Sequence, residues 1–140
     1  MKAHEIHKKE AEFINRHDAD AFAELFSSDA VLSDPAYPEP VKGREAVKKD
    51  MAGFVASFPD LNIRLVTSVA ADDGTIAAEW VLTGTNRGPI EAPTGTIPPT
   101  NKAMELRVAT FDRLDGEGRI VEERRYYDQA ALFGQLGLSP

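Results

Sequence analysis

The chain has 140 residues, a formal net charge of −7 and no cysteine. This length suits one domain with a single hydrophobic core, and the missing thiols exclude disulfides, thiol chemistry and thiolate metal sites. The negative charge would repel phosphates and anionic lipids, so we expect neither nucleic acid nor a membrane as a partner. No apolar run approaches the ~18 residues of a membrane span. Residues 1–5 lack the apolar segment of a secretion signal, which predicts a cytoplasmic protein.

The first part of the chain has the spacing of helices. Residues 3–17 place apolar side chains on one helix face, and a short helix follows Asp18, which is a suitable N-cap. Residues 30–33 are predicted as a short strand, and the three prolines within residues 34–40 predict a turn-rich loop. Residues 43–58 form the clearest helical pattern, which Pro59 ends.

After Pro59 the hydrophobic period changes to two, which is typical of strands. The predicted strands, joined in part by glycine-containing hairpin turns, are residues 61–71, 75–86, 102–115 and 119–127. Residues 87–101 are rich in Pro, Gly and Thr and predict a lid, a binding loop or an extended hairpin. A last short helix covers residues 129–136. Helices first and a meander second predict one α+β domain over residues 1–140.

This order of elements resembles the nuclear-transport-factor-2-like fold, a cystatin-like α+β barrel. The resemblance implies a cone-shaped, curved antiparallel sheet with three N-terminal helices packed on its concave face. Residues 34–35 with 43–46 resemble a loop and helix start found across that superfamily. Residues 94–95 with 97–101 resemble a loop of its SnoaL-like polyketide cyclases, and residues 118–122, Tyr126-Tyr127-Asp128 and residues 132–137 resemble the C-terminal signature of these cyclases. The resemblance also implies a homodimer through the sheet, or a tetramer. We expect no cofactor.

Asp128 is the first candidate catalytic residue. The resemblance implies that it is the general acid/base of an intramolecular aldol ring closure. It ends the last predicted strand after Tyr126, and burial beside aromatic walls would raise its pKa toward neutrality. The alternative is that Asp128 caps the helix that begins at Gln129. Some cyclases pair this aspartate with a histidine on the preceding strand, where this chain has Arg113 or Leu114, so the sequence does not identify the donor to an enolate.

Asp34 is the second candidate catalytic carboxylate. In ketosteroid isomerases an aspartate in a matching Asp-Pro loop shuttles the substrate proton, but their oxyanion-binding positions fall here on Glu10 and Thr110, which argues against steroid isomerisation. Limonene-type epoxide hydrolases need an Arg and an Asp where this chain has Trp80 and Leu82. Asp34 could instead be a simple turn residue before a proline.

Apolar side chains at helical and strand spacing predict the walls of a ligand cavity, because core and pocket share one surface in a cone-shaped domain. The predicted substrate-binding residues are Trp80, Tyr126, Met51, Phe54, Tyr37, Thr110 and Glu10. Glu10 interrupts the apolar stripe of the first helix, so it either projects into the cavity or reaches water at the edge of the stripe.

The two histidines nearest the N-terminus, His4 and His7, are three residues apart, but the sequence indicates no third ligand, so no metal site is predicted. The charged run of residues 122–125 predicts a cross-strand network or a subunit interface, because both faces of that strand carry charge. We therefore expect an enzyme that uses cyclase- or isomerase-type acid–base chemistry on a neutral ketone-bearing or polycyclic small molecule. The alternative is a non-catalytic protein of the same fold that binds a small apolar ligand.

Overall fold

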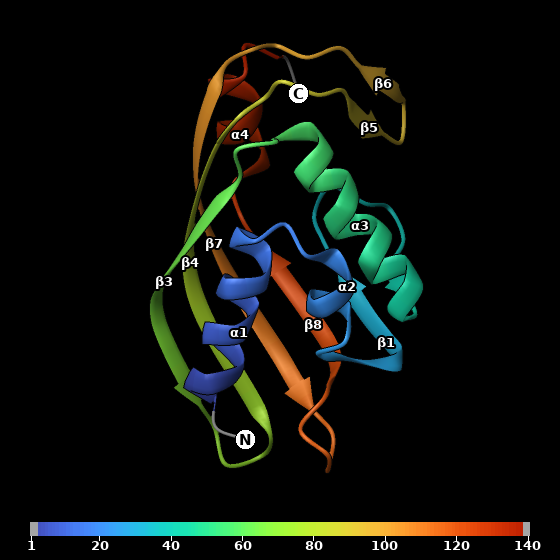
Figure 1. Ribbon diagram of the computed structural model, residues 1–140, viewed down its shortest axis with the longest axis vertical. Coiled ribbons are helices and arrows are strands. Elements are labelled where there is room, and N and C mark those ends of the chain that lie inside the picture. The colour runs from blue at the N-terminus through green and yellow to red at the C-terminus, as the bar shows by residue number, and fades with distance from the viewer. Residues whose placement is uncertain (1–2, 139–140) are drawn as a thin grey trace.

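The computed structural model describes residues 3–138 as a curved sheet of six strands, with α1, α2 and α3 lying across one of its faces (Figure 1). The helices are α1 (Ala3–Asn15), α2 (Ala19–Ala23), α3 (Arg44–Ser57) and α4 (Gln129–Gln135). The strands are β1 (Phe26–Ser33), β2 (Val41–Lys42), β3 (Asn62–Ala70), β4 (Thr75–Thr85), β5 (Ile90–Ala92), β6 (Gly95–Ile97), β7 (Ala103–Leu114) and β8 (Ile120–Tyr126). The predicted α+β class is confirmed. In the described residues, no helix is long and apolar enough to cross a bilayer.

The order of the large sheet is β2-β1-β8-β7-β4-β3. Its neighbours pair antiparallel with one exception, because β1 runs parallel to β8. The sheet is therefore mixed, and the prediction of a purely antiparallel sheet is wrong at this pair. The long connection from β1 through α3 and the meander allows β8 to return beside β1 in the same direction, which a tight hairpin would forbid.

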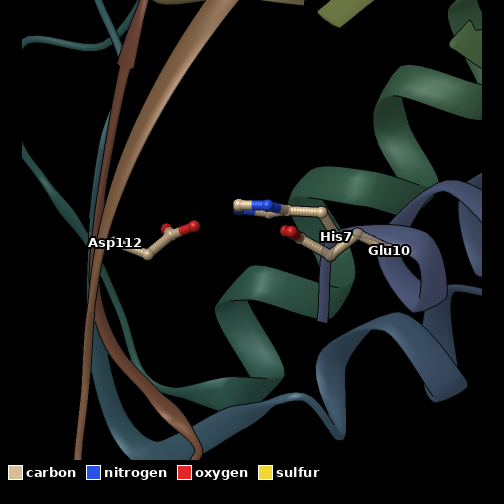
Figure 2. Close-up of side chains that lie close together, drawn as sticks. All are labelled: His7, Glu10 and Asp112. Atoms are coloured by element: carbon tan, nitrogen blue, oxygen red, sulfur yellow. The ribbon is translucent and has the colours of Figure 1, made fainter. Parts of the chain in front are cut away.

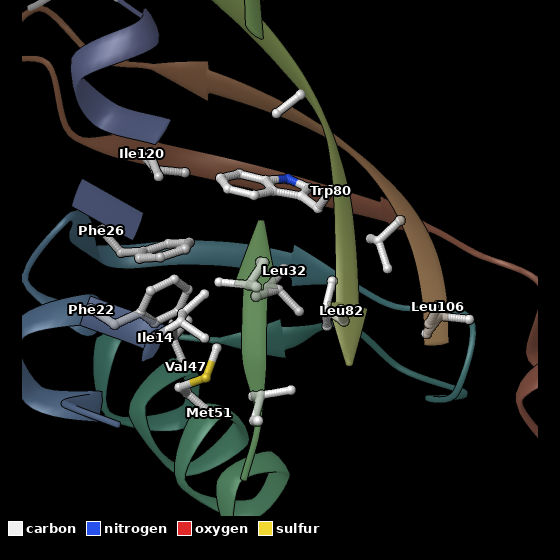
Figure 3. Close-up of a cluster of buried hydrophobic side chains, with 14 of the residues drawn as sticks. Ile14, Phe22, Phe26, Leu32, Val47, Met51, Trp80, Leu82, Leu106 and Ile120 are labelled. Carbon is white, nitrogen blue, oxygen red and sulfur yellow. The ribbon is translucent and has the colours of Figure 1, made fainter. Parts of the chain in front are cut away.

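The core lies between the concave face of the sheet and the helices. Along β7 every second residue from Met104 to Asp112 is buried, as expected for a strand with one face turned inward. Figure 3 shows Trp80 and Leu82 of β4 facing the same interior as Val47 and Met51 of α3. This packing places the inward side chains of β4, β7 and β8 beneath α1 and α3.

Helix α1 is fixed on the sheet by Asn15. The side-chain amide of Asn15 donates to the backbone oxygen of Ile63 at 3.0 Å, and its oxygen accepts from the Ile63 N–H at 2.7 Å. This two-point bond sets how the inward face of α1 lies over β3, and so fixes the direction of His7 and Glu10.

Residues 87–101 form the extended hairpin β5–β6, one of the three predicted alternatives. Its base is held by the fully buried Asn86, whose amide donates to the backbone oxygens of Ser57 and Gly88 and accepts from the N–H of Thr100. Gly88 lies so close to α3 that a Cβ there would be 1.9 Å from the Ala56 oxygen. The hairpin is therefore anchored at the end of α3, where it borders the interior of the cone.

Candidate functional site

A cavity of about 810 Å³ opens into the cone between the sheet, α1, α3, α4 and the β5–β6 hairpin. A volume of this size lies within the range of small-molecule sites. Its wall is mainly apolar, with a group of carboxylates and one arginine. Seven residues predicted from the sequence lie on this wall, namely Glu10, Asp34, Tyr37, Met51, Phe54, Trp80 and Thr110.

Two predicted site residues are placed elsewhere. Asp128 is exposed and is not in the cavity wall; its carboxylate accepts from the Ala131 N–H at 2.9 Å and caps α4. Tyr126 is 54% exposed and packs edge-on against Phe111. Tyr127 lines the cavity in its place. Asp128 therefore does not point into the cavity as expected, and Tyr126 does not form part of its wall.

A bulge between β7 and β8 explains why Tyr126 and Asp128 do not face the cavity. The pairing shifts between Arg113, which lies opposite Glu122, and Leu114, which lies opposite Ile120. Ile120 and Glu123 are both buried although they are three residues apart, so the alternation of faces changes within β8. The charged and aromatic residues that face the cavity are consequently Glu123, Arg125 and Tyr127.

Arg125 is the centre of a buried ionic network. Its Nη1 donates to Asp50 Oδ2 at 2.8 Å and to Asp34 Oδ2 at 3.2 Å, and its Nε donates to Glu123 Oε2 at 2.9 Å. Burial favours loss of the proton, yet the charges of Asp50, Glu123 and Asp34 keep the pKa of Arg125 well above its ordinary value. No described residue accepts a hydrogen bond from Nη2, and Arg125 lines the cavity. The charged run of residues 122–125 thus contributes Glu123 and Arg125 to an inward network whose other members, Asp34 and Asp50, lie in the loop after β1 and in α3 rather than on a neighbouring strand.

Asp34 is held by donors from three directions. Its Oδ1 accepts from the Tyr127 hydroxyl at 2.6 Å and the Ala36 N–H at 2.8 Å, while among residues 3–138 Oδ2 accepts only from Arg125. Burial and the charge of Asp34 raise the pKa of Tyr127 far above the neutral range, so its hydroxyl stays a donor. Asp34 therefore keeps a free lone pair on Oδ2 in a fixed orientation at the cavity wall.

Residues 4–136 match the family model of the SnoaL-like polyketide cyclases. The chain belongs to this family. No curated protein matches the chain. IdmH of Streptomyces antibioticus, described as a candidate polyketide cyclase, is 26% identical, with 99% of this chain and 100% of that chain covered and a TM-score of 0.75.

Two further solved structures show the same fold as this SnoaL-like protein. A SnoaL-like polyketide cyclase candidate from Jannaschia is 18% identical, with 99% and 93% of the two chains covered and a TM-score of 0.83. A protein of ketosteroid isomerase-like fold from Catenulispora acidiphila, solved in complex with trimethylamine, is 24% identical, with 96% and 93% covered and a TM-score of 0.78.

A second cluster of this SnoaL-like protein joins α1 to β7 (Figure 2). His7 and Glu10 extend from one face of α1 toward Asp112, and all three residues are buried. One possible ligand atom from each residue lies within 4.8 Å of those of the other two. Within residues 3–138, His7 Nε2, Glu10 Oε2 and both Asp112 oxygens have no hydrogen-bond partner. This corrects the expectation that His7 lacks further potential ligands, and Glu10 does not reach bulk water.

The surroundings of this cluster disfavour charge. Burial, followed by the nearby Glu123 charge, raises the pKa of Glu10 well above its ordinary value. Burial, the charges of Glu123 and Glu10 and a side-chain contact with Glu123 do the same for the pKa of Asp112, which lies directly opposite Glu123 in the sheet. Asp112 and Glu123 can share a hydrogen bond only when one of them is protonated, so Asp112 and Glu123 Oε1 lack a partner when both residues are ionised. Burial lowers the pKa of His7 to about 4. Without a bound cation, the cluster therefore favours neutral side chains.

The raised pKa of Glu10 predicts a stability change with pH. In the unfolded chain Glu10 loses its proton above pH ~4.5, whereas in the folded protein it keeps the proton because its pKa is raised. The contribution of Glu10 to the free energy of unfolding therefore falls as pH rises from ~4.5 toward the folded pKa, by up to ~1.4 kcal/mol per pH unit. In chelator-treated protein, Glu10→Gln should increase the free energy of unfolding relative to wild type, and more at pH 8 than at pH 5. Urea unfolding at both pH values measures this. The exposed Glu5→Gln is the control, and a Glu10→Gln difference that does not change with pH would contradict the prediction.

Proposed function

We propose that this protein catalyses acid–base chemistry on a neutral ketone-bearing or polycyclic small molecule, of the kind used by cyclases and isomerases. The observation that carries the proposal is the pairing of Asp34 and Arg125 at the wall of the cavity. Asp34 Oδ2 has a free lone pair, and Arg125 Nη2 has no protein acceptor among the described residues. A base and a cationic donor thus lie side by side in a mainly apolar site.

The proposed step is removal of a proton from carbon next to a carbonyl group. Asp34 Oδ2 takes the proton, and the electron pair of the C–H bond moves to the carbonyl oxygen as an enolate. Arg125 Nη2 donates to that oxygen, and a fixed donor in an apolar site stabilises developing charge strongly. In a cyclase the enolate carbon then attacks a second carbonyl of the same molecule, and the alkoxide that forms takes the proton back from Asp34. In an isomerase Asp34 returns the proton to a different carbon and the carbonyl group re-forms.

This assignment transfers the general base from Asp128 to Asp34. Asp128 serves α4 as a cap and is exposed, so it does not meet a ligand in the cavity. Arg125 supplies the donor that the sequence left unidentified. Tyr127 and Ala36 hold Asp34 in one orientation, which general-base catalysis requires.

The second candidate function is ligand binding without catalysis. It is favoured by the saturation of Asp34 Oδ1, which already accepts two hydrogen bonds, and by the three carboxylates that share the charge of Arg125. The two functions differ in what a bound ketone undergoes. Trp80 is the only tryptophan and lies on the cavity wall, so its fluorescence reports ligand binding.

The test uses cyclic ketones and β-diketones as probes. Probes that change Trp80 fluorescence are incubated with the protein in D₂O, and exchange of their α-protons is followed by NMR. Protein-dependent exchange of a bound probe supports the enzyme. Binding across the panel without any acceleration of exchange would refute it and leave the binding protein.

We also expect the outer face of the sheet to form a homodimer. Among the described residues, the large hydrophobic side chains exposed on β3, β7 and β8 are Val66, Val69, Phe111 and Tyr126. Exposed apolar groups on one sheet face suit a partner surface. Phe111→Asp should convert the dimer to a monomer in light-scattering measurements of mass, with Arg113→Asp as a control on the same face of β7. A wild-type monomer, or a dimer that survives Phe111→Asp, would contradict this expectation.

A further inference from the structure

The cluster of His7, Glu10 and Asp112 has a structural feature that the proposed acid–base chemistry does not use. Within residues 3–138, four of the five buried side-chain N and O atoms without a hydrogen-bond partner belong to these three residues. Unsatisfied polar atoms are costly inside a protein and normally have a partner. We propose that His7, Glu10 and Asp112 together bind a divalent transition-metal ion, with Zn²⁺ as the best fit.

The spacing of the three residues fits one shared ion. Their ligand atoms lie within 4.8 Å of one another but make no direct hydrogen bonds. Zinc bonds to nitrogen and oxygen are about 2.0–2.2 Å long, so two ligands on one ion are about 3.3–4.2 Å apart. Figure 2 shows the side chains from α1 and β7 pointing toward the same gap. The three ligand atoms are therefore close to the spacing that one shared ion requires.

The contact of His7 with Ser68 is compatible with the form that a metal ligand needs. Its Nδ1 lies 2.6 Å from Ser68 Oγ, and with the proton on Nδ1 the lone pair of Nε2 faces the gap. Metal-bound histidines commonly donate their other ring N–H to an oxygen in this manner, which fixes the ring orientation. The edge of Trp80 also packs against the His7 ring, with 5.6 Å between centroids. Ser68 is thus a positioning residue of the proposed site.

Charge balance favours a cation in this gap. Arg125 is already shared by Asp34, Asp50 and Glu123 through direct ion pairs, so it leaves Glu10 and Asp112 without a paired cation. Two buried carboxylates need either two protons or two positive charges. A divalent ion supplies both charges at once.

The donor set selects the class of metal. An imidazole nitrogen with two carboxylates suits Zn²⁺, Mn²⁺, Fe²⁺ or Co²⁺, whereas Ca²⁺ and Mg²⁺ prefer oxygen ligands alone. Three protein ligands are also the number found in zinc sites that keep an open position. Glu10 is part of the cavity wall, so an ion bound to it would border the bound ligand. A role in polarising a ligand carbonyl rests on the proposed function, but metal binding itself does not.

The test begins with chelator-stripped, full-length protein titrated with Co²⁺, followed by visible absorption, and with Zn²⁺ as the competitor. We expect one Co²⁺ per chain, displaced by Zn²⁺, with the signal lost in His7→Gln and in Asp112→Asn. Ser68→Ala should weaken Co²⁺ binding by about 10–100-fold, the range for loss of a group that orients a ligand. The exposed His4→Gln is the matched control on α1 and should bind like wild type. Unchanged Co²⁺ affinity in His7→Gln would overturn the proposal.

A second measurement avoids variants that fail to fold. The chain has three histidines, so ¹⁵N NMR of the wild-type rings can follow each one separately. Zn²⁺ should shift Nε2 of His7 and leave His4 and His17 unchanged. No shift of His7 at millimolar Zn²⁺ would mean that protons alone satisfy the cluster, and would refute the site. Asp34→Asn should still bind Co²⁺ like wild type, so failure of the metal proposal and failure of the proposed chemistry give different results.

Discussion

Asp34→Asn should slow α-proton exchange of a bound ketone by about 10²–10⁴-fold, the usual contribution of a general base. Asparagine keeps the shape of the side chain and can still accept from Tyr127, but its amide cannot take a proton from carbon. Quenching of Trp80 fluorescence should give a similar dissociation constant for both proteins, because the cavity wall remains apolar. The comparison therefore separates loss of chemistry from loss of binding.

Asp128→Asn is the control for this experiment. Asp128→Asn should leave the exchange rate unchanged, because Asp128 lies outside the cavity and accepts a hydrogen bond from the N–H of Ala131. Asparagine is also a good N-cap, so stability should change by less than ~1 kcal/mol. An Asp128→Asn protein that loses exchange, beside an Asp34→Asn protein that keeps it, would return the catalytic role to the end of β8.

Arg125→Met should lower the free energy of unfolding by about 3–5 kcal/mol at neutral pH, the range for breaking a buried ion pair from one side. Methionine matches the aliphatic part of arginine but removes the only direct ion-pair partner of Asp34, Asp50 and Glu123 among the described residues. These carboxylates would then be buried beside one another without a cation. Urea unfolding monitored by circular dichroism measures the change.

The neighbouring residue supplies a matched control. Arg124 lies on the opposite face of β8, pairs with Glu122 at 3.0 Å and is 42% exposed in its side chain. Arg124→Met should cost no more than ~1 kcal/mol, as is usual for a surface ion pair. Equal losses in the two variants would show that the inward network does not stabilise the fold. An Arg125→Met protein with the same free energy of unfolding as wild type would also show that the network does not stabilise the fold.

Hydrophobic periodicity was sufficient to predict most of the helices and strands. The spacing in residues 43–58 predicts α3, and the alternation after Pro59 predicts the meander, because each segment buries one face against the same core. The parallel pairing of β1 with β8 was not predictable from these local patterns. It depends on where the chain returns after a long connection, which no short segment records.

The site was predictable only in part, and β8 shows why. Counting alternate residues from the buried Ile120 would turn Tyr126 and Asp128 inward, but the bulge after Ile120 reverses the faces. The run of residues 122–125 has an acid and an arginine on each face, so hydrophobicity could not reveal the reversal. The inward position of Arg125 therefore emerged only from the strand pairing.

The cluster around Glu10 was hidden for a different reason. His7 and Glu10 are three residues apart on α1, a spacing that the sequence does display. Asp112 comes from β7, more than a hundred residues later, and lies in a strand whose other inward residues are largely apolar. The signal for this cluster was Asp112, a charged residue on the same strand face as Met104, Leu106 and Val108. A charged side chain on a buried face needs a partner or a ligand.

The measurement that tests the proposed function most directly is a crystal structure of the protein with a ketone probe that quenches Trp80. The proposal predicts an acidic C–H carbon within about 3.5 Å of Asp34 Oδ2 and the carbonyl oxygen within hydrogen-bonding distance of Arg125 Nη2. A ligand that fills the cavity with its carbonyl turned away from both groups would contradict the proposal and favour a binding protein.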